Sequence, residues 1–273
     1  MMKLGIAGTP PLTFRSLSMW LGMPVLWAAT RVLRVPLRIE RSDWRELGSL
    51  TVTNMIVWHV VAINALAVLS SGRAAILGYT MPIFAALWGV AVFGQRLTAR
   101  NVVGVVAAAL GVALLLWHEL AQMAGRPWGA FGMLVAAAVW ALGTLQLRRT
   151  RIVAPTLAIV FWMSLATTLV MTLLAFGIER ERWHAPDAVT WAAVLYNAVL
   201  IFGFAQPLWL LMARTLPPMA SSLSVMMIPV LGTVSGAWWL KEQLHWQDGA
   251  AIALMMVAIG SVLLPARRAP GPV

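Results

Sequence analysis

Cysteine is absent from the 273-residue chain, which excludes a disulfide framework and a thiolate metal site. Charge is also scarce, because 11% of the residues are charged against roughly 25% in a soluble globular domain. Such a chain has too few polar side chains to cover a water-facing surface. Catalytic signatures are missing as well, since no GxSxG, HExxH, P-loop or GxGxxG motif occurs. We therefore expect no enzyme, no metal site, no catalytic residue and no cofactor.

Hydrophobic residues make up 61% of the chain, and the mean hydropathy is +0.83. Apolar runs of about 18 or more residues with almost no charge are typical of membrane-spanning helices. In lipid the backbone must satisfy its own hydrogen bonds, which favours helices over an open sheet. The sequence thus predicts an all-α, polytopic helix bundle in a lipid bilayer. The nine predicted spans are 12–30, 47–69, 73–94, 101–118, 128–147, 156–178, 188–212, 218–240 and 246–264.

The net charge of +11 raises the question of nucleic acid as a partner. The basic residues lie instead in short loops, and no long basic run or basic amphipathic helix occurs, so we expect no nucleic-acid partner. Loop 31–45 holds five arginines, and an excess of Lys and Arg marks cytoplasmic loops. Threading nine spans from this loop places the C-terminus in the cytoplasm. We expect a multi-pass protein of a bacterial inner membrane.

The chain contains an internal repeat. YTMPIFAALWGVAVFGQRL at 79–97 returns in altered form as MMIPVLGTVSGAWWLKEQL at 226–244, with a constant offset of 147 residues. Threading gives the two copies opposite directions, and inverted repeats are the architecture of many secondary transporters. We predict a first repeat at 1–120, a second at 127–265 and a tail at 266–273. The first repeat lacks the partner of helix 128–147, so we expect either a start site placed too late or a true nine-helix variant.

The sequence resembles the EamA family of the drug/metabolite transporter superfamily. The resemblance is carried by SGRAAILGYTMPIFAALWGVAVFGQRLTARNVVGVVAAALGVALLLW (71–117) and PPMASSLSVMMIPVLGTVSGAWWLKEQLHWQDGAAIALMMVAIGSVLLP (217–265). Each is similar to the last two helices of that family's five-helix repeat. The resemblance implies two inverted five-helix repeats, here without the first helix, and movement of small metabolites, often export of amino acids or their derivatives.

Polar side chains in the middle of predicted spans are candidates for a substrate cavity. His59 and Gln206 are related by the same offset, so they lie at equivalent depths in the two halves. Polar groups within hydrocarbon normally face the bundle interior or a wet cavity. We hypothesise that both line a central site together with Asn54 and Asn64. The alternative is that they form interhelical hydrogen bonds.

Five tryptophans lie away from the expected membrane interfaces, namely Trp58, Trp88, Trp140, Trp162 and Trp209. Trp209 is three residues after Gln206 and Trp58 is four after Asn54, and these spacings share a helical face. With Trp88 and Trp140 they would wall a cavity suited to aromatic or amphiphilic solutes. The alternative is packing or lipid contact.

Glycine and proline positions suggest how the predicted helices pack and bend. Gly232 and Gly236, matched by Ala85 and Gly89, have the small-residue spacing of closely packed membrane helices. The predicted hinges are three prolines, because proline removes a backbone donor and kinks a helix. They are Pro82, Pro207 and Pro229.

The sequence predicts an exporter of small organic metabolites, such as amino acids or derivatives, working by alternating access. One alternative is a flippase of a lipid-linked sugar or amphiphile on the same fold. Another is a membrane protein that transports nothing. The sequence predicts neither the substrate, nor the energy coupling, nor the oligomeric state.

Overall fold

The computed structural model describes residues 1–78, 80–94, 99–121, 127–215, 231, 234–235, 237–239, 241 and 245–263. Within these residues the regular structure is helical, as expected. The predicted helix 218–240, with Pro229, Gly232 and Gly236, falls largely or wholly outside the described residues, as does the tail 266–273. The fold is therefore described for the rest of the chain.

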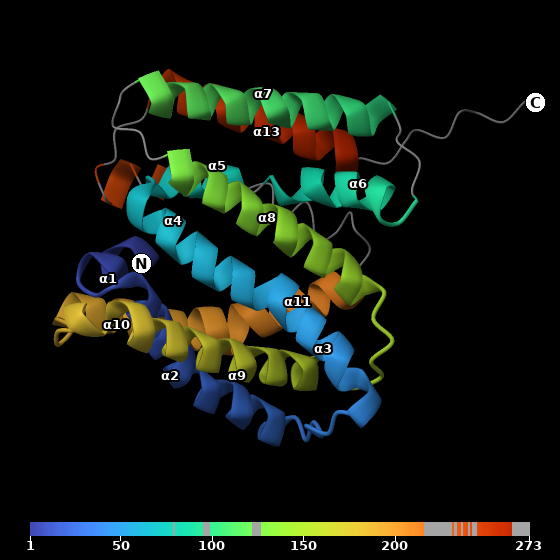
Figure 1. The fold of residues 1–273 in the computed structure, drawn as a ribbon, viewed down its shortest axis with the longest axis vertical. Coiled ribbons are helices and arrows are strands. Elements are labelled where there is room, and N and C mark those ends of the chain that lie inside the picture. Colours follow the sequence, from blue (N-terminus) through green and yellow to red (C-terminus); the bar gives the residue numbers. More distant parts are fainter. Residues whose placement is uncertain are drawn as a thin grey trace, which may run out of the picture.

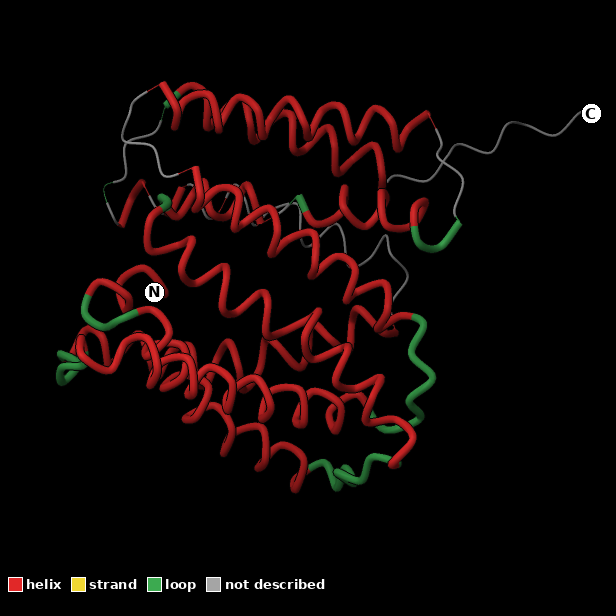
Figure 2. The backbone as a smooth tube through the Cα atoms, in the orientation of Figure 1, coloured by secondary structure: helices red, strands yellow, loops and turns green. Residues whose placement is uncertain are grey.

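The helices follow one another in short segments along the chain (Figures 1 and 2). The longer α-helices are α2 (Pro11–Val32), α7 (Ala99–Ala121), α8 (Pro127–Arg148), α9 (Thr156–Leu174) and α13 (Trp246–Leu263). The shorter α-helices are α1 (Met2–Ala7), α3 (Trp44–Thr51), α4 (Ile63–Val68), α5 (Ser71–Gly78), α6 (Met81–Ala91), α10 (Ala188–Tyr196) and α11 (Gln206–Thr215). Short 3-10 turns are η1 (Arg41–Asp43) and η5 (Arg180–Arg182).

Four segments of the described chain are π-helical, in which each backbone N–H bonds five residues back. They are η2 (Val52–Ile56), η3 (Trp58–Ala62), η4 (Ala175–Glu179) and η6 (Asn197–Ala205). The π-helix is rare and frequently marks functional sites. Under the 147-residue offset, η2 and η3 correspond to positions 199–209, which overlap η6. The two matched helices are thus distorted at equivalent depths.

Five stretches of the described chain are long and apolar enough to cross a membrane by length and composition. They are Arg41–Val68, Ser71–Ala91, Pro127–Arg148, Thr156–Arg182 and Ala188–Thr215, and a shorter apolar helix covers Val102–Gly111. Predicted span 12–30 forms one continuous helix, α2, but is not among the five. Arg15 in its second turn is one reason, because a charged side chain lowers the hydropathy of the segment.

Two helix pairs that are related by the offset pack directly against each other. The most extensive helix contact of the described chain joins α7 to α13, and α2 packs against α9 as well as η6. Figure 1 shows that the members of each pair run in opposite directions. In α7, Gly111 lies against α13, where a Cβ added to the glycine would meet Leu254 Cβ at 3.4 Å. Small residues at such a seam let helix backbones approach closely.

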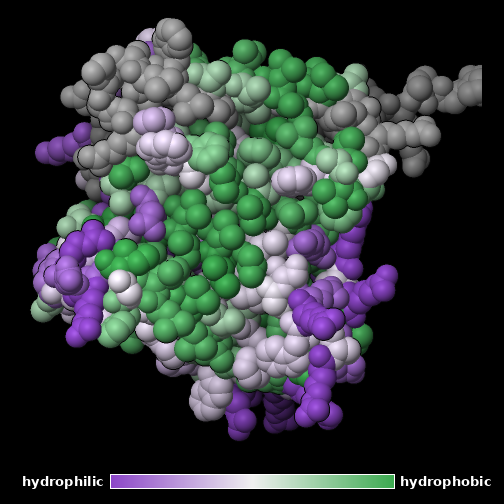
Figure 3. Space-filling model, viewed as in Figure 1, coloured by the Kyte–Doolittle hydropathy of each residue, from purple (hydrophilic) through white to green (hydrophobic). Residues whose placement is uncertain are grey.

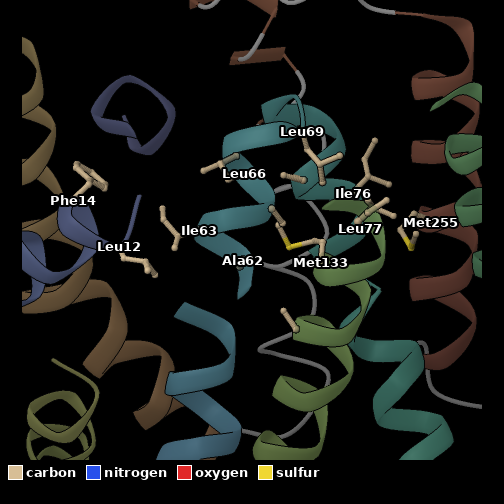
Figure 4. Close-up of a cluster of buried hydrophobic side chains, with 14 of the residues drawn as sticks. Leu12, Phe14, Ala62, Ile63, Leu66, Leu69, Ile76, Leu77, Met133 and Met255 are labelled. Carbon is tan, nitrogen blue, oxygen red and sulfur yellow. The ribbon is translucent and has the colours of Figure 1, made fainter. Parts of the chain in front are cut away.

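The core lies between these pairs and joins helices from both halves. Figure 4 shows Ile76 and Leu77 of α5 near Met255 of α13, and Met133 of α8 on the side of Ala62. A second cluster packs α2, α3, α9 and α11 around Leu26, which is fully buried. A hydrophobic belt crosses the middle of the face seen in Figure 3, with hydrophilic side chains at its left and right edges. We call the edge with loops 33–40 and 149–155 the basic end, and the edge with loops 69–70 and 183–187 the mixed end.

Candidate functional site

His59 lies in η3 and is 2% exposed. Neither of its ring nitrogens has a hydrogen-bond partner within the described part of the chain. Its neighbour is an aromatic ring, because the His59 and Phe202 centroids lie 5.4 Å apart at an interplanar angle of 63°. The interhelical hydrogen bond considered above for His59 is thus not formed with any described residue. A buried imidazole without a partner is costly, which makes it a functional candidate.

Gln206 is the first residue of α11 and is half-buried. Its backbone N–H donates to the carbonyl of Ile201, five residues back. Pro207 follows and has no N–H to donate, so the helix changes register where that donor is missing. The structure therefore places the predicted Pro207 hinge at the junction between a π-helical and an α-helical segment.

Four of the five tryptophans singled out from the sequence gather around α8. The Trp58 and Trp140 ring centroids are 4.5 Å apart, and those of Trp140 and Trp209 are 5.6 Å apart. Trp88 of α6 donates its indole N–H to the carbonyl of Ala138, at 2.8 Å. Rings from η3, α8 and α11 thus form one continuous tryptophan ladder (Trp58, Trp140 and Trp209). Such a surface accepts aromatic or apolar groups and, through the ring faces, cations.

The two asparagines form hydrogen bonds to backbone carbonyls and not to this ladder within the described residues. Asn54 is buried and donates to the carbonyl of Leu50, at 3.2 Å. It fills the space left by Gly143 of α8, where a Cβ would lie 2.6 Å from its amide nitrogen. Asn64 is exposed and donates to the carbonyl of Val60, at 2.8 Å. Both side chains therefore bond within their own helix, a common arrangement for short polar side chains.

Pro82 lies in the first turn of α6, and the predicted helix 73–94 is divided between α5 and α6. Proline is well tolerated in the first turn of a helix, where its missing N–H would have no partner. Thr80, just before α6, donates its hydroxyl to the carbonyl of Leu77, at 2.7 Å. Ala85 and Gly89 are half-buried and buried in α6, which packs chiefly against α8. Gly232 and Gly236, which match them under the 147-residue offset, lie outside the described residues.

Arg15 was absent from the predicted site, yet it contacts the same Phe202 ring as His59. It is 3% exposed, and its guanidinium lies 5.4 Å from the centroid of the same Phe202 ring. Its Nη2 donates to the sulfur of Met2, at 3.0 Å, and its Nε has no partner within the described chain. A signal existed in the sequence, because an ionisable residue inside an apolar span is a functional candidate by default.

Metal binding needs a cluster of ligands that we do not find in the described residues. No three His, Asp or Glu side chains come together there in a way that would hold an ion. The expectation that the protein has no cofactor stays a prediction.

A helical bundle with several apolar spans, a polar cluster and an aromatic ladder in its interior defines a polytopic membrane protein. Residues 1–117 and 127–264 match the EamA-like transporter family, so the chain belongs to this family. The resemblance drawn from the sequence is confirmed. The protein is a multi-pass membrane transporter, of a family that is generally non-enzymatic.

Several relatives carry transporter names. The chain is 24% identical over 248 residues to the uncharacterized transporter YoaV of Bacillus subtilis (strain 168), covering 89% of this chain and 84% of the relative. It is 25% identical over 209 residues to the uncharacterized inner membrane transporter YedA of Escherichia coli (strain K12), covering 74% and 67%. A crystal structure described only as "Crystal structure of protein" matches with a TM-score of 0.71 at 21% identity. That match covers 97% of this chain and 93% of the other, and it shows the fold.

Proposed function

We propose that this transporter exports small organic metabolites, such as amino acids or their derivatives, across a bacterial inner membrane by alternating access. In this proposal residues 1–120 and 127–265 are inverted repeats. The C-terminus is cytoplasmic in this proposal. Two similar halves of opposite sense exchange inward- and outward-open forms of nearly equal energy.

One observation carries the proposal. The helices Arg41–Val68 and Ala188–Thr215 run in opposite directions and are both π-distorted near the middle (Figure 1). They contribute Trp58 and Trp209 to the tryptophan ladder, which Trp140 completes. Matched irregular backbone beside an aromatic surface supports a solute site where the two halves meet. In this site Gln206 and Trp88 are further lining residues.

The test is counterflow in proteoliposomes that contain the purified chain. We expect labelled solute to enter against a trans excess of the same solute, for at least one member of an amino-acid panel. Trp140→Leu should lower the exchange rate at least about tenfold, because one lost contact of about 1.4 kcal/mol is a factor of ten. Trp128→Leu, on the same helix but 81% exposed, should exchange normally. No exchange across the panel would contradict the proposal.

A flippase is the second candidate, and one groove favours it. An open apolar groove of about 370 Å³ is lined by Trp20, Met23, Pro24 and Trp27 of α2 with Phe161 of α9. An acyl chain would fit such a surface, because these side chains offer almost entirely apolar contacts. Movement of a fluorescent lipid analogue between leaflets of the same proteoliposomes, in the absence of amino-acid counterflow, would favour the flippase.

A further inference from the structure

The buried charge of Arg15 lacks a counter-ion within the described chain. A guanidinium has five N–H donors in a planar fork, and the interactions of Arg15 are one hydrogen bond to the Met2 sulfur and the contact with Phe202. Thioether sulfur is a weak acceptor. Glu179 is the acidic side chain that binds the start of the same helix, and it pairs with Arg182, at 3.9 Å, rather than with Arg15. The N–H donors of the Arg15 guanidinium therefore have almost no strong acceptor within the described chain.

His59 adds a second set of unused polar atoms at the same ring. Arg15 of α2 and His59 of η3 each lie 5.4 Å from Phe202, which belongs to η6. Three helices from the two proposed halves thus converge on this cluster of Arg15, His59 and Phe202. A buried charge without a partner is strongly unfavourable, and no acid of the described chain offsets it. The geometry calls for a strong acceptor that the described chain does not supply.

A carboxylate has the chemistry that this cluster lacks. Its two oxygens accept parallel hydrogen bonds from the arginine fork, and such charge-assisted pairs are roughly twice as strong as neutral ones. An imidazole N–H donates to the same group, and the Phe202 ring contacts the apolar body of the solute. We propose that Arg15 and His59 form the subsite for the carboxylate of the transported solute, an inference that rests on the proposed transport function.

The structure holds this subsite closed. Both side chains are almost fully buried, and α1 packs against α2, α4 and α10 with its Met2 sulfur on the guanidinium. Carboxylate binding replaces that weak acceptor with a strong one. Exposure of the subsite therefore requires Met2 to leave Arg15, which places a path between the subsite and the mixed end beside α1.

The experiment uses the purified full chain in lipid nanodiscs and three probes that share one phenyl body. Phenylacetate is anionic, phenylacetamide is neutral and 2-phenylethylammonium is cationic. Thermal unfolding and tryptophan fluorescence report binding without any transport. We expect phenylacetate to raise the unfolding temperature and to bind at least about tenfold more tightly than the amide, because hydrogen bonds to charged groups are the stronger kind. The ammonium probe should not bind, because it would bring a second positive charge to Arg15.

Three variants separate a ligand site from a structural arginine. Arg15→Met should lose the response to phenylacetate and, without ligand, should be at least as stable as the wild type, because an unpaired buried charge is removed. A purely structural arginine predicts lower stability instead. Arg15→Lys keeps the charge without the fork and should bind phenylacetate about tenfold more weakly than the wild type does. Arg31 lies exposed on the same helix. Arg31→Met should therefore bind phenylacetate as the wild type does.

Equal binding of the amide, unchanged phenylacetate binding in Arg15→Met, or no response to phenylacetate in the wild type would each overturn the carboxylate subsite. The transport proposal fails separately. Phenylacetate binding that depends on Arg15, without counterflow of any solute, leaves the subsite standing and removes the proposed export of amino acids. Counterflow that is unchanged in Arg15→Met supports the transport proposal and overturns the carboxylate subsite.

Discussion

Trp140 shows how one side chain connects two distant parts of the chain. Its ring centroid lies 4.5 Å from that of Trp58 and 5.6 Å from that of Trp209, and an aromatic pair contributes about 0.5–1.5 kcal/mol beyond area burial. We expect Trp140→Leu to lower the free energy of unfolding by about 1–3 kcal/mol and to reduce the near-UV circular dichroism of the coupled rings. Chemical unfolding in detergent measures the first effect. Trp128→Leu is the control, and an equal loss in that variant would refute the ladder.

Asp187 makes part of the stability depend on pH. Its carboxylate caps α10 by accepting from the Thr190 N–H, at 2.7 Å. The hydrogen bonds from Thr190, first its hydroxyl and then its N–H, lower the pKa of Asp187 below 3.8. Because the folded pKa is depressed, this stabilisation is present above the ordinary pKa and is lost as pH falls through the folded value. In Asp187→Asn the unfolding temperature should fall less steeply with acidification below about pH 4 than in the wild type. Identical pH profiles would contradict this.

At the scale of single residues, the sequence predicted which side chains lie in the interior better than it predicted which residues they contact. His59 and the tryptophans were predicted from their depth in apolar spans. Arg15 was not included among the predicted site residues, although it lies inside the predicted span 12–30. The tertiary structure places it under α1, away from water.

At the scale of elements, α2 packs closely against η6. A Cβ on Gly22 would lie 2.8 Å from Phe202 Cβ and 3.0 Å from the carbonyl oxygen of Ala198. Backbone cannot yield as a flexible side chain does, so Gly22→Ala should destabilise the protein by about 1–3 kcal/mol. Gly48→Ala in α3 meets nothing within 4 Å and should be neutral or stabilising by about 0.5–1 kcal/mol. Thermal unfolding of the two variants checks both signs, and a stable Gly22→Ala protein would disprove the close contact.

The start of α2 is capped by a side chain distant in sequence. Glu179, buried at the end of η4, accepts from the N–H groups of Leu12 and Thr13, at 3.0 and 2.7 Å. A carboxylate at a helix N-terminus is favoured by the helix dipole. Glu179→Gln should lower the unfolding free energy by about 1–3 kcal/mol. Exposed Glu181 in the neighbouring turn is the matched control, and Glu181→Gln should change little; similar losses in both would argue against the cap.

At the scale of the whole molecule, the absence of cysteine makes the membrane orientation directly testable. Ser42 and Ala185 lie in exposed segments at the basic end and the mixed end respectively. If the basic end is cytoplasmic, an impermeant maleimide should label Ala185→Cys in intact cells and Ser42→Cys only after permeabilisation. The cysteine-free parent measures background. The reverse labelling pattern would invert the proposed orientation and, with it, the direction of export.

By itself the sequence determined the all-helical membrane class, the family, the approximate limits of the described helices and the residue types of the interior. These follow from composition and from periodicity within single segments, which are local properties of the chain. It did not predict the division of 73–94 into α5 and α6, nor the π-helical register before Pro207. Those depend on how backbone donors find acceptors once neighbouring helices are packed.

Only the tertiary structure decided that Arg15 and His59 share the ring of Phe202 and that Glu179 caps α2. These residues lie on helices far apart in sequence, and no local pattern records which faces of those helices meet. The physical reason is that helix packing is chosen by the sum of many small contacts, such as those of Gly22 and Gly143. The position of one charge relative to another follows from that sum.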